Sequence, residues 1–137
     1  MSHPDGLPEL FLDRSLGRKK VPQLLRVEGV RLVTLAEHYG IPHDEGVQDV
    51  EWLRLCGEQN WLAIMKDDRI RYVSIERDAL VSSGVRAAVI TNANLSAAEM
   101  AARIVRALPG LADVCETRSG PFLLALHQSR IEEISLD

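Results

Sequence analysis

Acidic residues follow two apolar segments that have the composition of buried strands. The stretch "WLAIMKDDRI", residues 61–70, passes from five apolar residues into a lysine and two aspartates. The shorter run "ELFL", residues 9–12, ends at Asp13. In an open parallel α/β sheet, sites form outside the carboxyl ends of the strands. We therefore expect Asp13 and Asp67 to lie at the same edge of a sheet.

A third acidic segment begins a predicted helix, "DVEWLRLCGEQN", at residues 49–60. Asp49 is expected as its N-cap, and Glu51 lies in its first turn. A helix that leads into a parallel strand starts near the edge where the preceding strand ended, so Asp49 should join the two strand-end acids. Clustered carboxylates repel one another unless a cation lies between them, and hard divalent cations prefer oxygen ligands. The pattern predicts a Mg²⁺ or Mn²⁺ site that acts on phosphate esters, although Asp49 alone could equally be only a helix cap.

Basic residues flank these acids. The run after the first strand contains Arg14, Arg18, Lys19 and Lys20. It is read either as a solvated start of a helix or as a set of contacts to an RNA backbone, because phosphate neutralisation dominates nucleic-acid affinity. Lys66 either stabilises phosphate charge as a point cation or forms an ion pair with Asp68. The sequence does not decide between the two roles of the basic run or between the two roles of Lys66.

Strands and helices must alternate along the chain to position these residues. Strands are expected at 9–12, 30–36, 61–65 and 85–91, and helices at about 17–29, 49–60, 74–82 and 96–110. Residues 37–48 are expected to form a polar loop, and Pro109-Gly110 to end the last helix. Two short β-type runs within 120–136 predict a terminal hairpin or edge strands. The order predicts a single domain, residues 1–137, that folds as a three-layer α/β/α sandwich with a mostly parallel central sheet.

Composition narrows the class of protein. A chain of 137 residues with a net charge of −4 and a pI of about 5.6 is not a generally basic nucleic-acid binder, although a local basic patch remains compatible. Cys56 and Cys115 lack metal-binding or redox spacing and are expected to be inert packing residues. The N-terminal residues do not resemble a signal peptide, and the sequence contains no membrane-spanning apolar stretch. A cytoplasmic protein with no membrane contact is expected.

The chain resembles a compact branch of the PIN-like nucleases, the toxin components of VapBC-type toxin–antitoxin pairs. The resemblance runs from about residue 9 to residue 126 through "LFLDRSLGRKKVPQLLRVEGVRLVTLAEHYG", "DVEWLRLCGEQNWLAIMKDDRIR" and "VRAAVITNANLSAAEMAARIVRALPGL". It is most specific at "FLDRSLGRK" and at the strand that ends in Lys-Asp. It implies a Mg²⁺- or Mn²⁺-dependent endoribonuclease that cleaves RNA and is neutralised by a cognate antitoxin. A homodimer is left open.

The resemblance also implies roles for individual residues. Asp13 matches the acid after the first strand, Asp49 and Glu51 match the two acids of the helix start, and Asp67 matches the acid of the Thr/Ser-Lys-Asp strand end. All four are implied to be catalytic, and Asp13, Asp49 and Asp67 to bind metal. The basic residues Arg14, Arg18, Lys19, Lys20 and Lys66 are the expected substrate contacts.

Two departures from the family pattern bear on the site. Met65 stands where a small hydroxyl residue usually precedes the lysine, and this removes a hydrogen bond to the site. Asn92 and Asn94 stand where many PIN domains have an acid or an asparagine. The resemblance therefore leaves the number of bound ions open.

Three other classes of protein share parts of this pattern. A receiver domain needs an acid pair after its first strand and a lysine at its last strand, and this order of residues does not provide them. A haloacid-dehalogenase-like phosphatase needs an aspartate two positions after Asp13, where the chain has Ser15. The remaining alternative is a catalytically inactive PIN-like binding module, against which the three retained acid positions argue.

Overall fold

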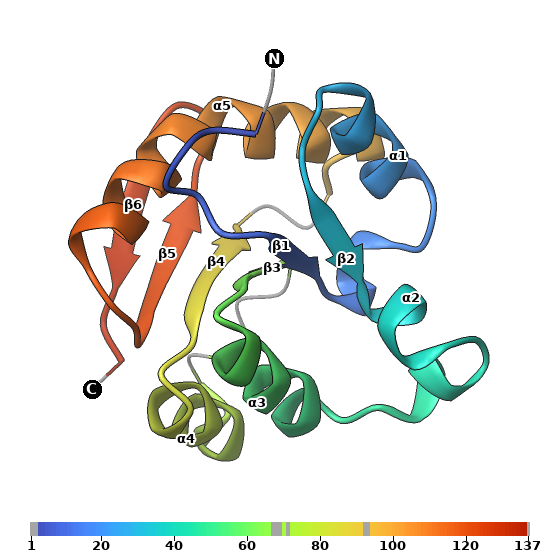
Figure 1. The fold of residues 1–137 in the computed structure, drawn as a ribbon, viewed down its shortest axis with the longest axis vertical. Helices are drawn as coiled ribbons and strands as arrows, with labels where there is room; N and C mark the ends of the chain where they lie inside the picture. Colours follow the sequence, from blue (N-terminus) through green and yellow to red (C-terminus); the bar gives the residue numbers. More distant parts are fainter. Residues whose placement is uncertain (1–2, 67–69, 71, 92–93, 137) are drawn as a thin grey trace.

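The computed structural model describes residues 3–66, 70, 72–91 and 94–136 (Figure 1). Its strands are β1 (Leu10–Leu12), β2 (Leu32–Thr34), β3 (Leu62–Met65), β4 (Arg86–Ile90), β5 (Phe122–Leu126) and β6 (Ile131–Ile134). Its α-helices are α1 (Lys20–Val27), α2 (Leu35–Tyr39), α3 (Asp49–Gln59), α4 (Ser74–Ser82) and α5 (Ala97–Thr117), and its short 3₁₀ helices include η1 (Arg14–Leu16) and η2 (His43–Gly46).

The strands form one sheet in the order β2-β1-β3-β4-β5-β6. The first five strands of this order are parallel, and β6 pairs antiparallel with β5 as a terminal hairpin. The register places Leu12, Ile64, Ala88 and Leu124 in one row across β1, β3, β4 and β5. The carboxyl ends of these strands therefore share one edge. The predicted mostly parallel α/β fold with a terminal hairpin is confirmed.

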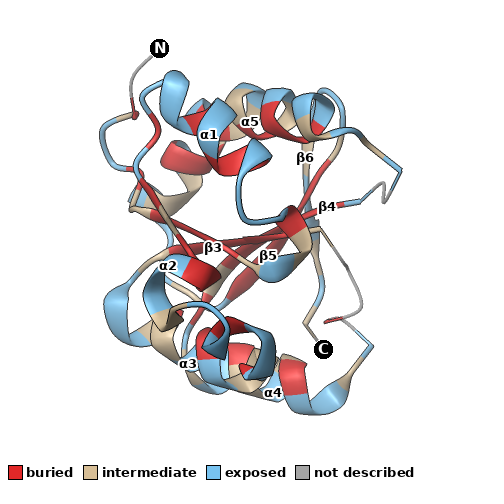
Figure 2. Ribbon diagram, turned by 90° about the vertical axis from the view of Figure 1, so that its right-hand side faces the viewer, coloured by how far each residue is buried: buried red, intermediate tan, exposed pale blue. Residues whose placement is uncertain are grey.

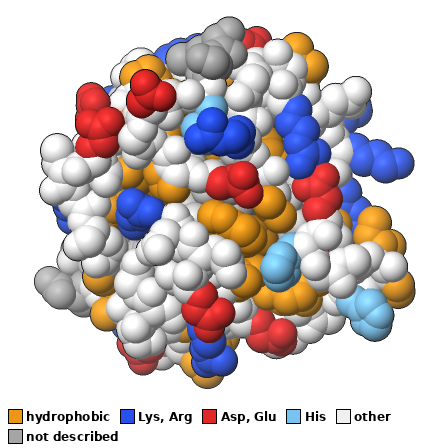
Figure 3. Space-filling view, viewed as in Figure 1, with side chains coloured by type: hydrophobic (Ala, Val, Ile, Leu, Met, Phe, Trp, Pro, Cys, Tyr) orange, Lys and Arg blue, Asp and Glu red, His pale blue; other side chains and the backbone are white. Residues whose placement is uncertain are grey.

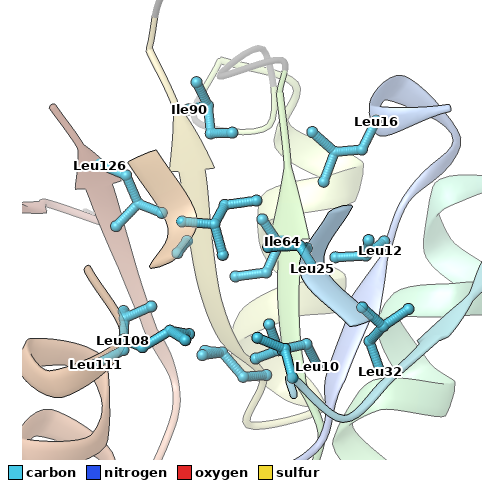
Figure 4. Packing of buried hydrophobic residues seen from close by; sticks show 14 of the residues in the cluster. Leu10, Leu12, Leu16, Leu25, Leu32, Ile64, Ile90, Leu108, Leu111 and Leu126 are labelled. Carbon is cyan, nitrogen blue, oxygen red and sulfur yellow. The ribbon is translucent and has the colours of Figure 1, made fainter. Parts of the chain in front are cut away.

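Helices cover both faces of the sheet (Figure 2). Strand β3 is buried on both sides: Ile64 packs in the cluster under α1 and α5, whereas Ala63 packs in the cluster under α3 and α4. Figure 4 shows Ile64 between strand neighbours and the helical residue Leu25. A strand enclosed on both faces needs a continuous apolar run, which is what "LAIM" supplies. The strand can then carry its polar successors to a fixed place at the edge.

Charge is dispersed over the face that Figure 3 shows, where Lys and Arg side chains are interspersed with Asp and Glu side chains. This mixture fits the small net charge of the chain. Within the described residues, no helix is long and apolar enough to cross a membrane.

The expectation of a polar loop at residues 37–48 was wrong in part, because two short helices occupy parts of this range. Strand β2 ends at Thr34, and α2 begins at once through a capping box: the Thr34 hydroxyl accepts from the Glu37 N–H, and the Glu37 carboxylate accepts from the Thr34 N–H, both at 3.0 Å. The sequence carried this Thr-x-x-Glu signal. A second short helix, η2, follows and brings Asp44 into the protein interior.

The predicted end of the last long helix at Pro109 was also wrong, because α5 continues to Thr117 with Pro109 inside it. Proline removes one backbone hydrogen bond. Beyond it, Leu111 and Ala112 are buried against the sheet, next to Leu108 in the preceding turn. Burying a leucine side chain contributes about 1.5–3 kcal/mol, which offsets the missing hydrogen bond.

Candidate active site

Asp13 follows β1 directly, and hydrogen bonds of both its backbone and its side chain hold it in place. Its N–H donates to the Ile64 carbonyl of β3 at 3.1 Å, so the backbone remains aligned with the sheet at this residue. Its carboxylate caps η1 by accepting from the Arg14 N–H at 2.6 Å, and it accepts from the Ser15 hydroxyl at 3.0 Å. The side chain is partly buried. Asp13 is therefore a fixed acid at the carboxyl edge of the sheet, as predicted.

Asp49 is fixed by a different kind of contact. It is the first residue of α3, and the N-cap is Gln48, so the expectation that Asp49 caps the helix was wrong. One carboxylate oxygen of Asp49 accepts from the Trp52 indole N–H at 2.9 Å. Trp52 is only 1% exposed and packs in the core between α3 and the sheet, as expected for a packing tryptophan. The buried indole orients Asp49 toward the sheet.

The two acids line one hollow with a volume of about 180 Å³. Its lining residues are Asp13, Arg14, Ser15, Asp49, Trp52, Met65, Ile70 and Glu76. Burial raises the pKa of Asp13 above its ordinary value, and the negative charge of Asp49 raises this pKa further, against the lowering effect of the Ser15 and backbone hydrogen bonds. The predicted convergence of Asp13 and Asp49 is thus present. We name this hollow the acidic cavity.

Ser15 is a site residue that the sequence pattern did not reveal. Its hydroxyl donates to Asp13 and accepts from the Lys66 N–H at 2.9 Å. The serine therefore links the end of β1 to the end of β3 and orients the carboxylate between them. The signal in the sequence is the spacing Asp-x-Ser directly after a buried strand. The Lys66 side chain is partly exposed, and its phosphate contact stays a prediction; the alternative partner, Asp68, lies outside the described residues.

Glu76 is a second residue that was missed. It lies in the first turn of α4, is only 8% exposed, and lines the acidic cavity with Asp13 and Asp49. Helix α4 was predicted at its observed bounds, but its periodicity alone does not show that its first turn faces the strand ends. A glutamate near the start of a helix is commonly read as a dipole-stabilising residue.

Glu51 lies outside the acidic cavity. It is exposed, and its carboxylate accepts from the Gln48 N–H at 3.4 Å as part of a capping box. It lines a neighbouring hollow that also reaches Asp49 and Glu76. Asp67, the third predicted acid, and Asn92 lie outside the described residues.

Comparison with known proteins decides the family. A model described as "PIN like domain" matches residues 8–92, a range that includes β1 and β3 and the acids that follow them. This chain belongs to the PIN-like domain family. It is also 37% identical over 128 residues to a Mycobacterium tuberculosis (strain ATCC 25618 / H37Rv) protein named "Putative ribonuclease VapC45", with 93% of this chain and 92% of that protein aligned. No solved structure matches the chain. The resemblance to VapC-type PIN-like nucleases is confirmed.

In this PIN-like domain, part of the basic run has structural partners. The Arg18 guanidinium donates to both carboxylate oxygens of Asp44 at 2.9 Å, and Asp44 is only 3% exposed. The Arg14 guanidinium donates to the carbonyls of Asp44 and Val47 at 2.6 and 3.0 Å. The two arginines therefore fix the segment around η2. Lys19 and Lys20, which start α1, are exposed.

The donor chemistry of the acidic cavity fits a hard divalent cation. Carboxylate oxygens of Asp13 and Asp49 face the cavity that Glu76 also lines, and Asp13 is desolvated beside another negative charge. A cation between them would relieve both the repulsion and the desolvation. Within the part of the chain that the structure describes, no group of three His, Cys, Asp or Glu residues has metal-holding geometry. The predicted third ligand, Asp67, falls outside that part.

Proposed function

We propose that this protein is a Mg²⁺- or Mn²⁺-dependent endoribonuclease, the toxin component of a VapBC-type pair that a cognate antitoxin neutralises. Membership of the PIN-like family and similarity to a protein named as a ribonuclease support the reaction class. The observation that carries the proposal is the acidic cavity, where Asp13 lies desolvated beside the charge of Asp49. Holding two like-charged carboxylates close together in a partly desolvated cavity is costly for a purely structural role.

In the proposed reaction, three aspartates bind the metal ion and two neighbouring residues orient two of them. Asp13, Asp49 and Asp67 hold the metal ion. A bound Mg²⁺ or Mn²⁺ supplies a water of lowered pKa and polarises the scissile phosphate. Ser15 fixes the orientation of Asp13 through its hydroxyl, and the Trp52 indole does the same for Asp49.

Positioning of the attacking water and binding of phosphate complete the proposed reaction. Asp49 orients the attacking water more directly than Glu51, because Asp49 lines the acidic cavity whereas the Glu51 carboxylate caps α3. Lys66 neutralises phosphate charge from the end of β3. Lys19 and Lys20 contact the RNA backbone from the start of α1, where they are exposed.

The antitoxin is proposed to cover the carboxyl edge of the sheet with a basic side chain. An arginine or lysine placed in the acidic cavity would satisfy its carboxylates by charge-assisted hydrogen bonds. The same contact would keep RNA and metal out. We propose the cytoplasm as the location of the pair.

The test of the proposed function is metal-dependent RNA cleavage. The purified protein is incubated with a mixed RNA substrate, first with EDTA and then with excess Mg²⁺ or Mn²⁺. We expect cleavage to stop with EDTA and to return with either ion. Asp113→Asn serves as a control of equal charge change, because Asp113 is exposed on α5. Cleavage that persists after exhaustive chelation would refute the metal-dependent mechanism.

A further inference from the structure

A second hollow, of about 220 Å³, lies between α5 and the turn that joins β5 to β6. Its polar lining includes Arg103 and Arg106 from α5 and His127, Gln128, Ser129 and Arg130 from the turn. Three guanidinium groups therefore converge on one depression. We name this hollow the basic pocket. None of its residues belongs to the acidic cavity.

The two arginines of α5 are held in place by the turn itself. Nη1 of Arg103 donates to the Leu126 carbonyl at 3.3 Å, and Nη1 of Arg106 donates to the Gln128 carbonyl. A guanidinium has five N–H donors, so one anchoring bond leaves most of its donors for another acceptor. The anchoring fixes the position of both cations before any ligand arrives, which lowers the entropy cost of binding.

Acidic groups near the basic pocket do not cancel its charge. Glu132 is shared: one oxygen lies 2.8 Å from Nε2 of His127 and 3.8 Å from Nη1 of Arg130. The Arg130 side chain is 63% exposed. Glu99 lies one helical turn before Arg103 and interacts with it electrostatically. Three guanidinium groups and two carboxylates leave the site with a net positive charge. The forked N–H donors of a guanidinium match the geometry of phosphate oxygens.

The basic pocket lies at the same edge of the sheet as the acidic cavity. Leu12 and Leu124 are level in the register, and β1 and β5 are parallel. Asp13 follows one residue beyond this row, and His127 follows three residues beyond it. Three strand-to-strand steps of about 4.8 Å separate β1 from β5, a lateral distance of about 14 Å. A single RNA strand of a few nucleotides can span such a separation, so one strand can reach both hollows.

We propose that the basic pocket binds a backbone phosphate of the RNA substrate, a few nucleotides from the phosphate that is cleaved. The inference rests on the proposed function, because the acidic cavity defines where cleavage occurs. A strand that crosses the ends of β3 and β4 would place one phosphate at Asp13 and a distant one at Arg103, Arg106 and Arg130. The pocket then sets a minimum substrate length and a register for the RNA.

The test measures RNA binding in an Asp13→Asn background, which prevents cleavage. Arg130→Gln removes one guanidinium without removing an anchoring bond to the turn, and Arg103→Gln with Arg106→Gln removes the other two. Arg31→Gln is the matched control: it makes the same charge change at an exposed residue that directly precedes β2, at the opposite edge of the sheet. Affinity is measured for single-stranded RNAs of about three and about twelve nucleotides over a range of salt concentrations.

We expect Arg130→Gln to weaken binding of the longer RNA only and to reduce its salt slope by about 0.7, the value for one phosphate contact in a single strand. The variant that combines all three Arg→Gln substitutions should reduce the slope by about two. Arg31→Gln should change the binding of neither RNA. An unchanged slope and affinity in Arg130→Gln would overturn the proposal and assign these arginines to fixing the turn.

Cleavage by the otherwise unmodified protein, measured in parallel, separates the two proposals. If it cleaves RNA while the pocket variants bind the longer RNA normally, the basic pocket is refuted and the proposed function stands. If the pocket variants lose their salt slope but the protein with an intact pocket cleaves no RNA at any metal concentration, the proposed function fails and the phosphate site stands.

Discussion

Asp13 and Asp44 are two shielded aspartates on neighbouring segments, and the chain compensates their charges differently. Asp44 is only 3% exposed and receives a two-point hydrogen bond from the Arg18 guanidinium. Asp13 is partly buried, receives hydrogen bonds from a backbone N–H and a serine hydroxyl, and faces another acid, Asp49. One carboxylate has a full positive partner, and the other has neutral donors and a like charge.

The difference separates a structural acid from a candidate site acid. A buried ion pair with two good hydrogen bonds holds a segment in place, and breaking it leaves an uncompensated charge. A carboxylate that remains desolvated beside another carboxylate lacks such compensation, and a ligand cation is the natural partner. Removing the charge of Asp13 should therefore reduce activity but not stability, whereas removing the cation that pairs with Asp44 should reduce stability but not metal binding.

The largest effect is expected from Asp13→Asn, which keeps the shape of the side chain. Loss of a residue that orients a metal ligand commonly costs 10–100-fold in activity, and loss of the ligand itself should cost at least about 100-fold. Because the substitution removes a repelled charge, the melting temperature without metal should stay equal or rise. RNA cleavage rates and thermal melting check this. A variant that fails to fold would make Asp13 structural, like Asp44.

Ser15→Ala should produce the next largest effect. It removes the hydroxyl that orients Asp13 and accepts from the Lys66 N–H. We expect a loss of about 10–100-fold in cleavage or metal affinity with the fold retained. Ser83→Ala is the control, because Ser83 lies at the end of α4. Equal cleavage by Ser15→Ala and by the unmodified protein would remove the serine from the site.

Arg18→Ala should show the reverse pattern, with lost stability and intact metal binding. The substitution leaves Asp44 buried without its cation. Because Arg18 is 42% exposed, we expect a loss of about 1–2 kcal/mol in the free energy of unfolding, less than for a fully buried pair. Denaturant unfolding measures it, and Lys19→Ala should be neutral in the same assay. Unchanged stability would return Arg18 to the group of free RNA contacts.

The smallest effect concerns pH. The pKa of Asp13 is raised in the folded protein, first by burial and then by Asp49, so the folded state holds this proton more tightly than the unfolded chain. The stabilisation from protonated Asp13 is complete below its ordinary pKa of about 3.8 and is lost as pH rises through the folded value. Without metal, the melting temperature of the unmodified protein should therefore drop relative to Asp13→Asn across this window. A constant difference between the two would contradict a raised pKa.

Sequence was sufficient for the parts of the fold that one local signal determines. Apolar runs predicted β1, β3 and β4, and spacing predicted α3 and α4 within a residue or two. The end of α5 could not be predicted from Pro109, because burial of the following turn outweighed a local breaking signal. The start of α2 could have been predicted, since Thr34 and Glu37 form a readable capping box.

The sequence predicts those parts of the candidate site that lie at the ends of strands or at the start of the helix between them. The positions of Asp13 and Asp49 follow from the parallel topology. The partner of Arg18 does not, because Asp44 lies 26 residues away and reaches it only through the packing of η2. Glu76 was missed for the same reason: its place depends on how α4 packs, which no local pattern contains.

In the proposed mechanism, Asp13 and its neighbours hold the ion on which RNA cleavage depends. Titration with Mn²⁺, followed by the electron paramagnetic resonance signal of the free ion, measures this directly. We expect the unmodified protein and Asp113→Asn to take up Mn²⁺ equally and to cleave RNA as the ion binds. Asp13→Asn should lose both uptake and cleavage while remaining folded. Undiminished Mn²⁺ uptake by Asp13→Asn, or cleavage that does not follow uptake, would contradict a metal site at Asp13.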